Sequence, residues 1–174
     1  MKRIAVFLLL ALTACSSDPE SKKAPAGMVM MTIDGTEMLS VSASAVVTSA
    51  SLTGNPSVGV DAAYNTPNGK YIIMLRASTH DVFKLMDVGE YTVEGKDLPA
   101  NTGIIYYTPE GAPSSNAYSS LFVGTDVVGK IVITSIDTTN KFVSGTFECT
   151  VAHSDTGEML SITGGSFTQI PYRD

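Results

Sequence analysis

The 174-residue chain has no tryptophan, two cysteines and two histidines, and only 16% of its residues are charged. It also lacks any apolar run near the roughly 20 residues of a transmembrane helix, because the longest run covers only residues 4–12. Two histidines and one free cysteine, Cys149, at wide spacing make a poor zinc ligand set, so we expect no metal site. The net charge of −6 disfavours nucleic acid as a partner, since such binding depends on lysine and arginine.

The N-terminal segment has the parts of a secretory signal peptide. Lys2 and Arg3 form a positive start, residues 4–12 form a short apolar stretch, and Thr13 and Ala14 are small. A positive region, an apolar region and small residues, in this order, are typical of a segment that is removed on export. We therefore expect residues 1–14 to be absent from the mature protein.

The four residues Leu12-Thr13-Ala14-Cys15 resemble the lipobox of bacterial lipoproteins. The resemblance implies cleavage before Cys15, acylation of its sulfur and a membrane partner held through the lipid. Two or three acyl chains anchor a protein stably, whereas one is marginal. Residues 15–27 are polar and contain two prolines, which predicts a flexible tether. By similarity to enterobacterial sorting rules, Ser16 favours the outer membrane, with the periplasmic or surface face left open.

Cys149 has no partner for an intrachain disulfide if Cys15 carries lipid. Strand alternation places Cys149 on the same face as Phe147 and Val151. These apolar neighbours predict a buried thiol that packs as a small hydrophobic group, rather than a reactive or dimer-forming one.

From Met28 onward, apolar residues recur with a period of two, and turn residues interrupt them about every ten residues, as in sandwiches and barrels. We predict one all-β domain over residues 28–174, a single antiparallel β-sandwich with a β-barrel as the alternative. The expected strands cover residues 28–33, 37–41, 45–52, 58–63, 70–77, 89–93, 104–108, 118–123, 130–137, 142–153 and 159–170. Residues 81–86 fit either a helical turn or a strand.

Three glycine-containing positions predict departures from straight strands. Asp34-Gly35 is a common hairpin dipeptide between two strands. Gly145 predicts a bulge or a close backbone contact, and Gly164-Gly165 predicts a kink in the last strand.

The C-terminal pattern over residues 131–170 carries a second resemblance. Residues 132–147 and 162–167, together with Ile33-Asp34-Gly35 and Gly89-Glu90-Tyr91-Thr92-Val93, resemble a recurrent pattern in small lipid-anchored all-β lipoproteins of the Bacteroidetes type. The function of that family is unknown. The resemblance therefore implies a fold and an envelope location, and it carries over no catalytic residue.

The residues that could support catalysis are His80 and His153. A hydrolase needs a nucleophile, a base and an orienting acid that converge in space. No Gly-x-Ser-x-Gly nucleophile elbow is present. We expect both histidines to be turn residues and the protein not to be an enzyme.

Acidic and amide groups on two turns offer oxygen ligands for calcium: Asp137 with Asn140, and Asp155 with Glu158. Neither turn has the ligand count of a calcium loop. Such residues usually cap the backbone of a turn, so we expect no cofactor and leave calcium as an open alternative.

Tyr106, Tyr107 and Tyr118 form the candidate binding surface. Tyr106 and Tyr107 are neighbours on a predicted strand, so their rings point to opposite faces and one is exposed if the other is in the core. The alternative is that each tyrosine only straddles the core and water, as its amphipathic ring allows.

Three functions are consistent with these features. The first is a non-enzymatic binding or structural module on a lipid tether, with an unknown envelope or extracellular ligand. The alternatives are a carrier of a small hydrophobic ligand and a small exported hydrolase. A carrier requires an apolar pocket of several hundred cubic ångströms, and a hydrolase requires a cleft that gathers a histidine with an acid and a hydroxyl.

Overall fold

The computed structural model describes residues 22–48, 55–67, 69–79, 85–95, 103–109, 117–124 and 127–174, so the predicted signal peptide and Cys15 lie outside the described residues. The described elements are β1 (Met28–Ile33), β2 (Thr36–Leu39), β3 (Ser42–Thr48), β4 (Ser57–Thr66), β5 (Gly69–Ser78), β6 (Gly89–Glu94), β7 (Gly103–Pro109), β8 (Tyr118–Ser119), the 3-10 turn η2 (Ser120–Phe122), β9 (Val127–Asp137), β10 (Phe142–His153) and β11 (Met159–Arg173). The all-β prediction is confirmed. Within the described ranges, none of the helices has the length and hydrophobicity of a membrane span.

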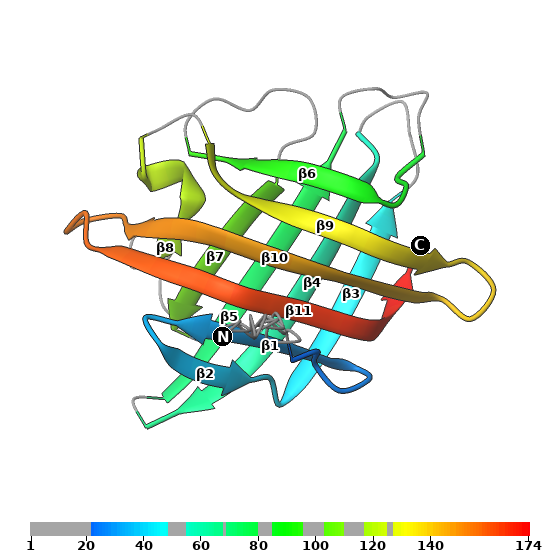
Figure 1. Ribbon diagram of the computed structural model, residues 1–174, viewed down its shortest axis with the longest axis horizontal. Helices are drawn as coiled ribbons and strands as arrows, with labels where there is room; N and C mark the ends of the chain where they lie inside the picture. The colour runs from blue at the N-terminus through cyan, green and yellow to red at the C-terminus, as the bar shows by residue number, and fades with distance from the viewer. Residues whose placement is uncertain are drawn as a thin grey trace, which may run out of the picture.

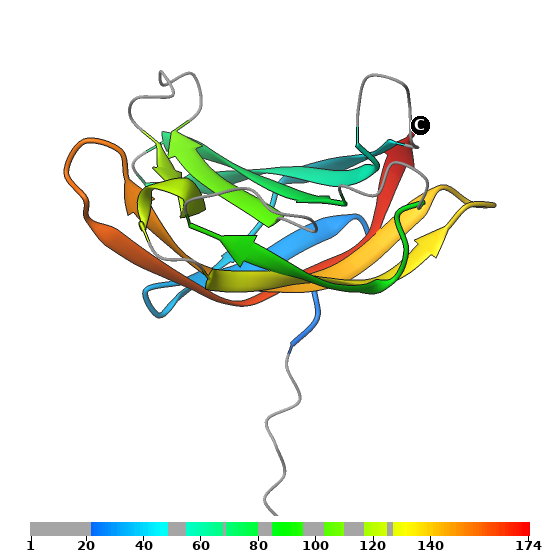
Figure 2. The ribbon, with the colours of Figure 1, turned by 90° about the horizontal axis from the view of Figure 1, so that it is seen from above.

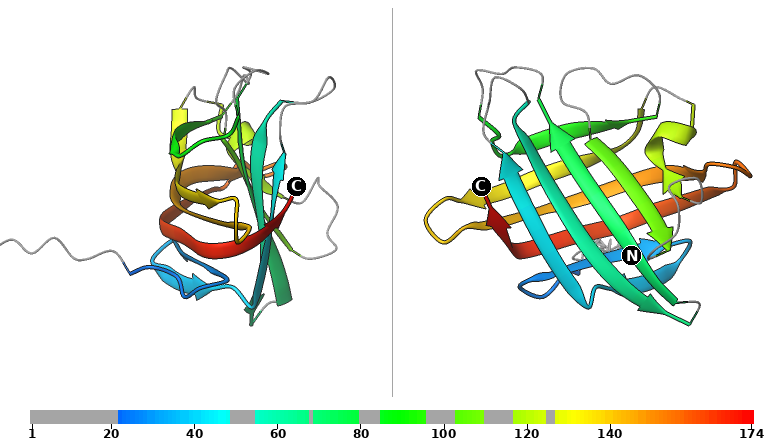
Figure 3. Two further views of the ribbon diagram at one scale, coloured as in Figure 1. Left: turned by 90° about the vertical axis from the view of Figure 1, so that its right-hand side faces the viewer. Right: turned by 180° about the vertical axis from the view of Figure 1, so that it is seen from behind.

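The strands form two facing layers that belong to one continuous sheet. The front layer in Figure 1 pairs β6, β9, β10, β11, β1 and β2 in that order, and the back layer pairs β3, β4, β5 and β7. Figure 2 shows the layers one above the other, and the right panel of Figure 3 shows the back layer from behind. This arrangement places one face of each layer against the other.

Short pairings join both edge strands of the back layer, β3 and β7, to the front layer. β11 pairs with β3 in parallel through Tyr172–Ala45 and Arg173–Val46, and β6 pairs with β7 in parallel through Val93–Gly103. The short strand β8 also bridges the layers, because it pairs with both β7 and β10. The fold thus combines the facing layers of a sandwich with the joined edges of a barrel. The two parallel pairings are exceptions to an otherwise antiparallel sheet.

The core lies between the layers and is built from the alternate residues of each strand. Phe147 is 2% exposed, Ile73 is 1% exposed and Phe167 is 1% exposed. Burial of such side chains is the main favourable contribution to folding, at roughly 25 cal/mol per Å² of apolar surface. The period-two pattern therefore correctly predicted the inward face that carries Phe147, Cys149 and Val151.

The predicted strand over residues 118–123 is wrong beyond Ser119. β8 ends at Ser119, and residues 120–122 form the 3-10 turn η2. The Ser119 Oγ accepts a hydrogen bond from the Leu121 backbone N–H at 3.2 Å. A serine side chain that binds nearby backbone in this way competes with strand pairing. Of the ambiguous segment 81–86, residues 81–84 lie outside the described residues.

The Asp34-Gly35 hairpin is confirmed. Both residues have left-handed backbone angles, with φ of 45° and 83°, as a two-residue type I′ turn requires. The Asp34 carboxylate also accepts a hydrogen bond from the Ser161 N–H at 3.0 Å. That bond holds the tip of the β1–β2 hairpin against β11.

The last residues of the predicted tether lie against the front layer. The Ala24 N–H donates to the Ser166 Oγ at 2.9 Å, and the Gly27 N–H donates to the Thr168 carbonyl at 2.7 Å. The domain therefore begins before Met28, and the chain reaches it across the outer face of β11. Figure 2 shows this N-terminal segment on the outer side of that layer.

Glycine and phenylalanine interlock between β10 and β11. Gly145 lies opposite Phe167, and Phe147 lies opposite Gly165. A Cβ added to either glycine would collide with the opposite phenylalanine ring and with a backbone carbonyl. The two rings lie 6.5 Å apart between their centroids. We call these four residues the Gly–Phe seam. The pairing register also shifts at Gly145 and beside Gly164-Gly165, which confirms both predicted irregularities.

Candidate functional site

A row of aromatic side chains crosses five strands at one end of the fold. Its members are Tyr64, Tyr71, Tyr107, Tyr118 and His153, one each from β4, β5, β7, β8 and β10. Directly opposite pairs in the register are Tyr64 with Tyr71, Tyr107 with Tyr118, and Tyr118 with His153. Opposite residues in an antiparallel pair share a face of the sheet. We call these five residues the tyrosine row.

The rings of the tyrosine row are in contact along most of its length. Tyr71 and Tyr107 stack with their centroids 4.9 Å apart and their planes at 10°. Tyr107 and Tyr118 are tilted at 6.1 Å, and Tyr118 meets the edge of His153 at 4.9 Å. Aromatic pairs in these arrangements are attractive beyond the area they bury. The rings from Tyr71 to His153 therefore form an unbroken series of aromatic contacts, and Tyr64 extends the row through its pairing with Tyr71.

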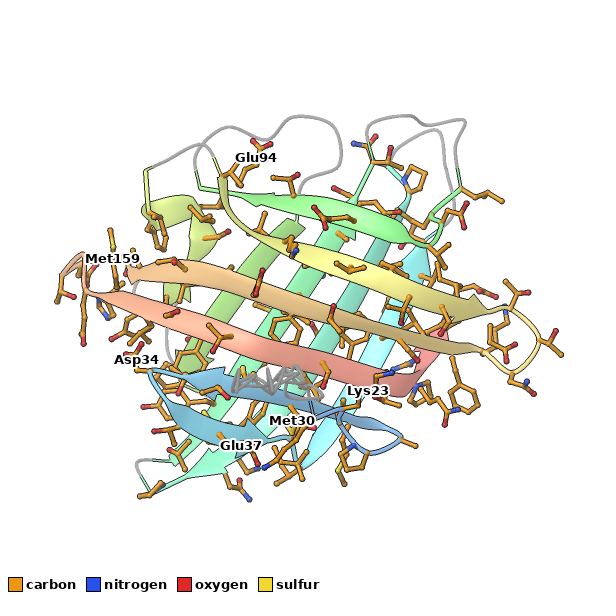
Figure 4. All side chains as sticks on the ribbon, viewed as in Figure 1. Lys23, Met30, Asp34, Glu37, Glu94 and Met159 are labelled. Atoms are coloured by element: carbon orange, nitrogen blue, oxygen red, sulfur yellow. The ribbon has the colours of Figure 1, made fainter. Side chains whose placement is uncertain are left out.

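A cleft of about 330 Å³ opens beside this row. One wall is the edge strand β2, and the opposite wall is the end of the β4–β5 hairpin. The lining residues are Thr36, Glu37, Met38, Leu39, Tyr64, Asn65, Thr66, Pro67, Tyr71 and Tyr107. Figure 4 labels Glu37 on β2 and Asp34 at the turn that precedes it, both at this end of the molecule. We call this hollow the tyrosine cleft.

The phenol groups of the row influence one another electrostatically. The pKa of Tyr107 is raised to about 12, mainly by burial and in smaller part by the neighbouring phenols of Tyr71 and Tyr118. Burial also raises the pKa of Tyr118, as does its hydrogen bond to Glu158. The Tyr118 hydroxyl donates that bond to the Glu158 carboxylate at 2.9 Å. The Tyr107 and Tyr118 phenols are thus neutral donors at physiological pH.

Carboxylates dominate the charge around the tyrosine cleft. Glu37 is the one charged side chain among the described lining residues. It forms an exposed ion pair with Lys22 at 3.3 Å. The negative charges of Glu158 and Asp34 both act on the Tyr118 phenol at the far end of the row. An anionic ligand would therefore meet no positively charged side chain among the described lining residues.

His153 serves the turn that joins β10 to β11. Its Nδ1 accepts hydrogen bonds from the backbone N–H groups of Asp155 and Thr156, at 3.1 and 3.2 Å. An Nδ1 that accepts these bonds carries no proton, so a neutral ring holds its proton on Nε2. This geometry matches the predicted turn role. His80 lies outside the described residues.

Asp137 also caps its own turn, as predicted. Its carboxylate accepts hydrogen bonds from the Thr139 and Asn140 backbone N–H groups and from the Asn140 side-chain amide. The bonds from Asn140 are the main reason why the pKa of Asp137 is lowered. In the part of the chain that the structure describes, no three histidine, cysteine or acidic side chains gather into a metal site.

The predicted binding residues are partly brought together. Tyr107 is 8% exposed and lines the cleft, and Tyr118 adjoins it in the row. The backbone of Tyr106 lies on β7 opposite Met74 and Ser119, but its side chain lies outside the described part of the structure. Cys15 lies outside the described residues.

Sequence reasoning missed Tyr64, Tyr71 and Glu37 as parts of this site. The signal for the first two was present, because Tyr64 and Tyr71 flank the predicted turn at Pro67 at similar distances and so pair across the hairpin. Glu37 has no comparable signal, since only the folding of β2 across the end of the layers brings it to the cleft.

Cys149 is buried, as predicted, with 5% of its surface exposed. Burial raises the pKa of its thiol, which keeps the reactive thiolate from forming near neutral pH. It therefore contributes packing and no exposed reactive group.

A family model described as "Domain of unknown function (DUF6252)" matches residues 44–171. No curated protein and no solved structure shows a significant match to the chain. The matched range contains every member of the tyrosine row, whereas β1, β2 and Glu37 precede it.

Proposed function

This chain belongs to the DUF6252 family of unknown function, and we propose that it is a lipid-anchored module of the bacterial cell envelope that binds a ligand without catalysing a reaction. The observation that carries this proposal is the tyrosine cleft. Its volume of about 330 Å³ is at the lower end of the range for small-molecule sites. Such sites combine aromatic and apolar walls with a few polar groups, and this cleft does so through Tyr71, Tyr107, Glu37 and Asn65.

The anchor in this proposal is the lipid on Cys15, and the short tether keeps the domain near the bilayer. Cys15 precedes Lys22 by seven residues (22 − 15). A fully extended residue spans at most about 3.6 Å, so Lys22 stays within roughly 25 Å of the lipid. Because the chain enters across the outer face of β11, the tether joins the domain on the side of the front layer.

A carrier of a small hydrophobic ligand is the second candidate, and Met38 and Leu39 in the cleft wall favour it. The space between the layers is occupied by the core cluster, however, so a ligand would bind at the end of the fold and not inside it. A hydrolase has less support, because the Nδ1 of His153 is already bonded to the backbone of its turn.

The lipid anchor is tested by Cys15→Ser. We expect the variant to lose palmitate label and to leave the membrane fraction, because serine lacks the sulfur to which the lipid is attached. Cys149→Ser is the matched control and keeps both the label and the membrane location. A Cys15→Ser protein that still carries label in the membrane fraction would contradict the anchor.

The cleft is tested by thermal denaturation against a panel of small sugars, peptides, amines and fatty acids. A compound that binds the folded state raises the melting temperature by mass action. We expect Tyr71→Ala to abolish that rise, whereas Met74→Ala on the opposite face of the same strand preserves it. A panel in which no compound gives a Tyr71-dependent rise would overturn the binding function.

A further inference from the structure

We propose that the tyrosine cleft selects an organic cation, a substituted ammonium group on a small apolar body. This inference rests on the proposed binding function and names the ligand class of the same site. Its basis is the combination of an aromatic wall, phenol oxygens and the Glu37 carboxylate in one hollow.

The charge of the rim favours a cation. The described lining residues include Glu37 but no lysine, arginine or histidine. Asp34 and Glu158 add two more carboxylates along the row, where both act on the Tyr118 phenol. A positive ligand gains from this field, whereas a carboxylate or phosphate would have to overcome it.

The walls of the cleft favour a weakly hydrated cation. Aromatic rings attract ammonium groups that lie within about 6 Å of a ring centroid. Tyr71 and Tyr107 provide two rings that stack at 4.9 Å, and Met38 and Leu39 from β2 line the same hollow. A methylated ammonium suits such walls better than a bare metal ion, which would keep its hydration shell.

Lys22 occupies the position from which it can compete with the ligand. Its ammonium is 3.3 Å from the Glu37 carboxylate, and the two side chains are 77% and 57% exposed. An exposed pair of this kind contributes little stability, so a ligand ammonium can replace the lysine at Glu37. Removing the positive charge of Lys22 should therefore tighten the binding of a cation.

The test is calorimetric titration of the full chain, purified from membranes in a non-ionic detergent without choline groups. The probes are choline and its uncharged carbon isostere, in which a tert-butyl group replaces the trimethylammonium. We expect choline to bind about tenfold more tightly than the isostere, the ratio that a partly desolvated cation–π contact provides.

Three variants give the direction of each effect. Glu37→Gln should weaken choline binding by about three- to tenfold and leave the isostere unchanged, because it removes the rim carboxylate. Lys22→Gln should tighten choline binding by about threefold, because Glu37 is then free of its competitor. Glu148→Gln is the control, since Glu148 is 55% exposed and paired with Lys130 on the outer face of β10, away from the cleft.

The outcomes separate this inference from the proposed function. Equal binding of choline and the isostere, or failure of both to bind while other compounds still give a Tyr71-dependent rise in melting temperature, overturns the cation inference alone. Failure of both probes together with a panel that shows no Tyr71 dependence overturns the binding function as well.

Discussion

The Gly–Phe seam and the tyrosine row are both aromatic, and both join neighbouring strands, but they differ in what surrounds each ring. In the seam, Phe147 and Phe167 each cover a glycine that has no room for a Cβ. In the row, Tyr71 and Tyr107 stack beside a cleft of about 330 Å³, and their hydroxyls interact with a neighbouring phenol.

This difference separates an aromatic group that packs from one that can bind. A ring that fills all its space contributes burial and shape, and any change of volume there costs stability. A ring that keeps an open side and a polar group near other polar groups is suited to recognition. Because its rings are fully packed, the seam should lose stability on substitution. Because its rings adjoin an open cleft, the row should respond to a bound ligand.

The largest effect that separates the two regions is expected at the seam. Phe147→Ala should lower the free energy of unfolding by about 3–5 kcal/mol, as a large-to-small change at a site that is 2% exposed. Urea denaturation measures this loss of unfolding free energy. Phe122→Ala is the control, because Phe122 is 47% exposed and should cost below about 1 kcal/mol. Equal losses of unfolding free energy for the two variants would show that Phe147 does not lie in the core.

A smaller effect is expected from the glycines of the seam. Gly145→Ala should destabilise by about 1–3 kcal/mol, because its Cβ would collide with the Val132 carbonyl and the Phe167 ring. Gly59→Ala on β4 is the matched control, since the nearest atom to its Cβ would be the Arg76 Cζ at 3.6 Å. That change should be neutral or stabilise by about 0.4–1 kcal/mol. Destabilisation of similar size at both glycines would contradict the close packing at Gly145.

The smallest effect belongs to the row and depends on pH. The ordinary pKa of Tyr107 is 10.0, and in the folded state it is raised to about 12. The unfolded chain therefore binds fewer protons between these values, and stability falls as the pH rises through that window. Tyr107→Phe should lose less stability in this pH window than the wild type, because it lacks the Tyr107 hydroxyl that titrates there. Tyr64 and Cys149 contribute equally to both proteins. Identical pH dependence for the two proteins would show that Tyr107 is not held in its neutral form.

The strands were predictable because their information is local. Alternation placed Phe147, Cys149 and Val151 on one face, and that face is buried in the core. The Asp34-Gly35 hairpin was predictable for the same reason, since two adjacent residues determine the turn. The end of β8 was not, because the Ser119 cap competes with strand pairing only after Tyr118 has been aligned with β7 and β10.

The site was less predictable because it depends on register between distant segments. Tyr118 meets His153 only because β8 adds to the end of β10, and Glu37 reaches the cleft only because β2 lies across the end of the two layers. No spacing along the chain encodes either contact. Tyr107 was a candidate by composition, but its position beside Tyr71 follows from the β5–β7 register.

The sequence by itself determined the all-β class, the buried face that carries Phe147, Cys149 and Val151, and the Asp34-Gly35 turn, since polar–apolar alternation and turn chemistry act over a few residues. The tertiary structure alone decided that the two layers join at their edges and that five aromatic residues from five strands form one row beside an acidic rim. The physical reason is that hydrogen-bond register between strands is chosen by the packing of the whole core, and a register is what brings distant side chains within reach of one ligand.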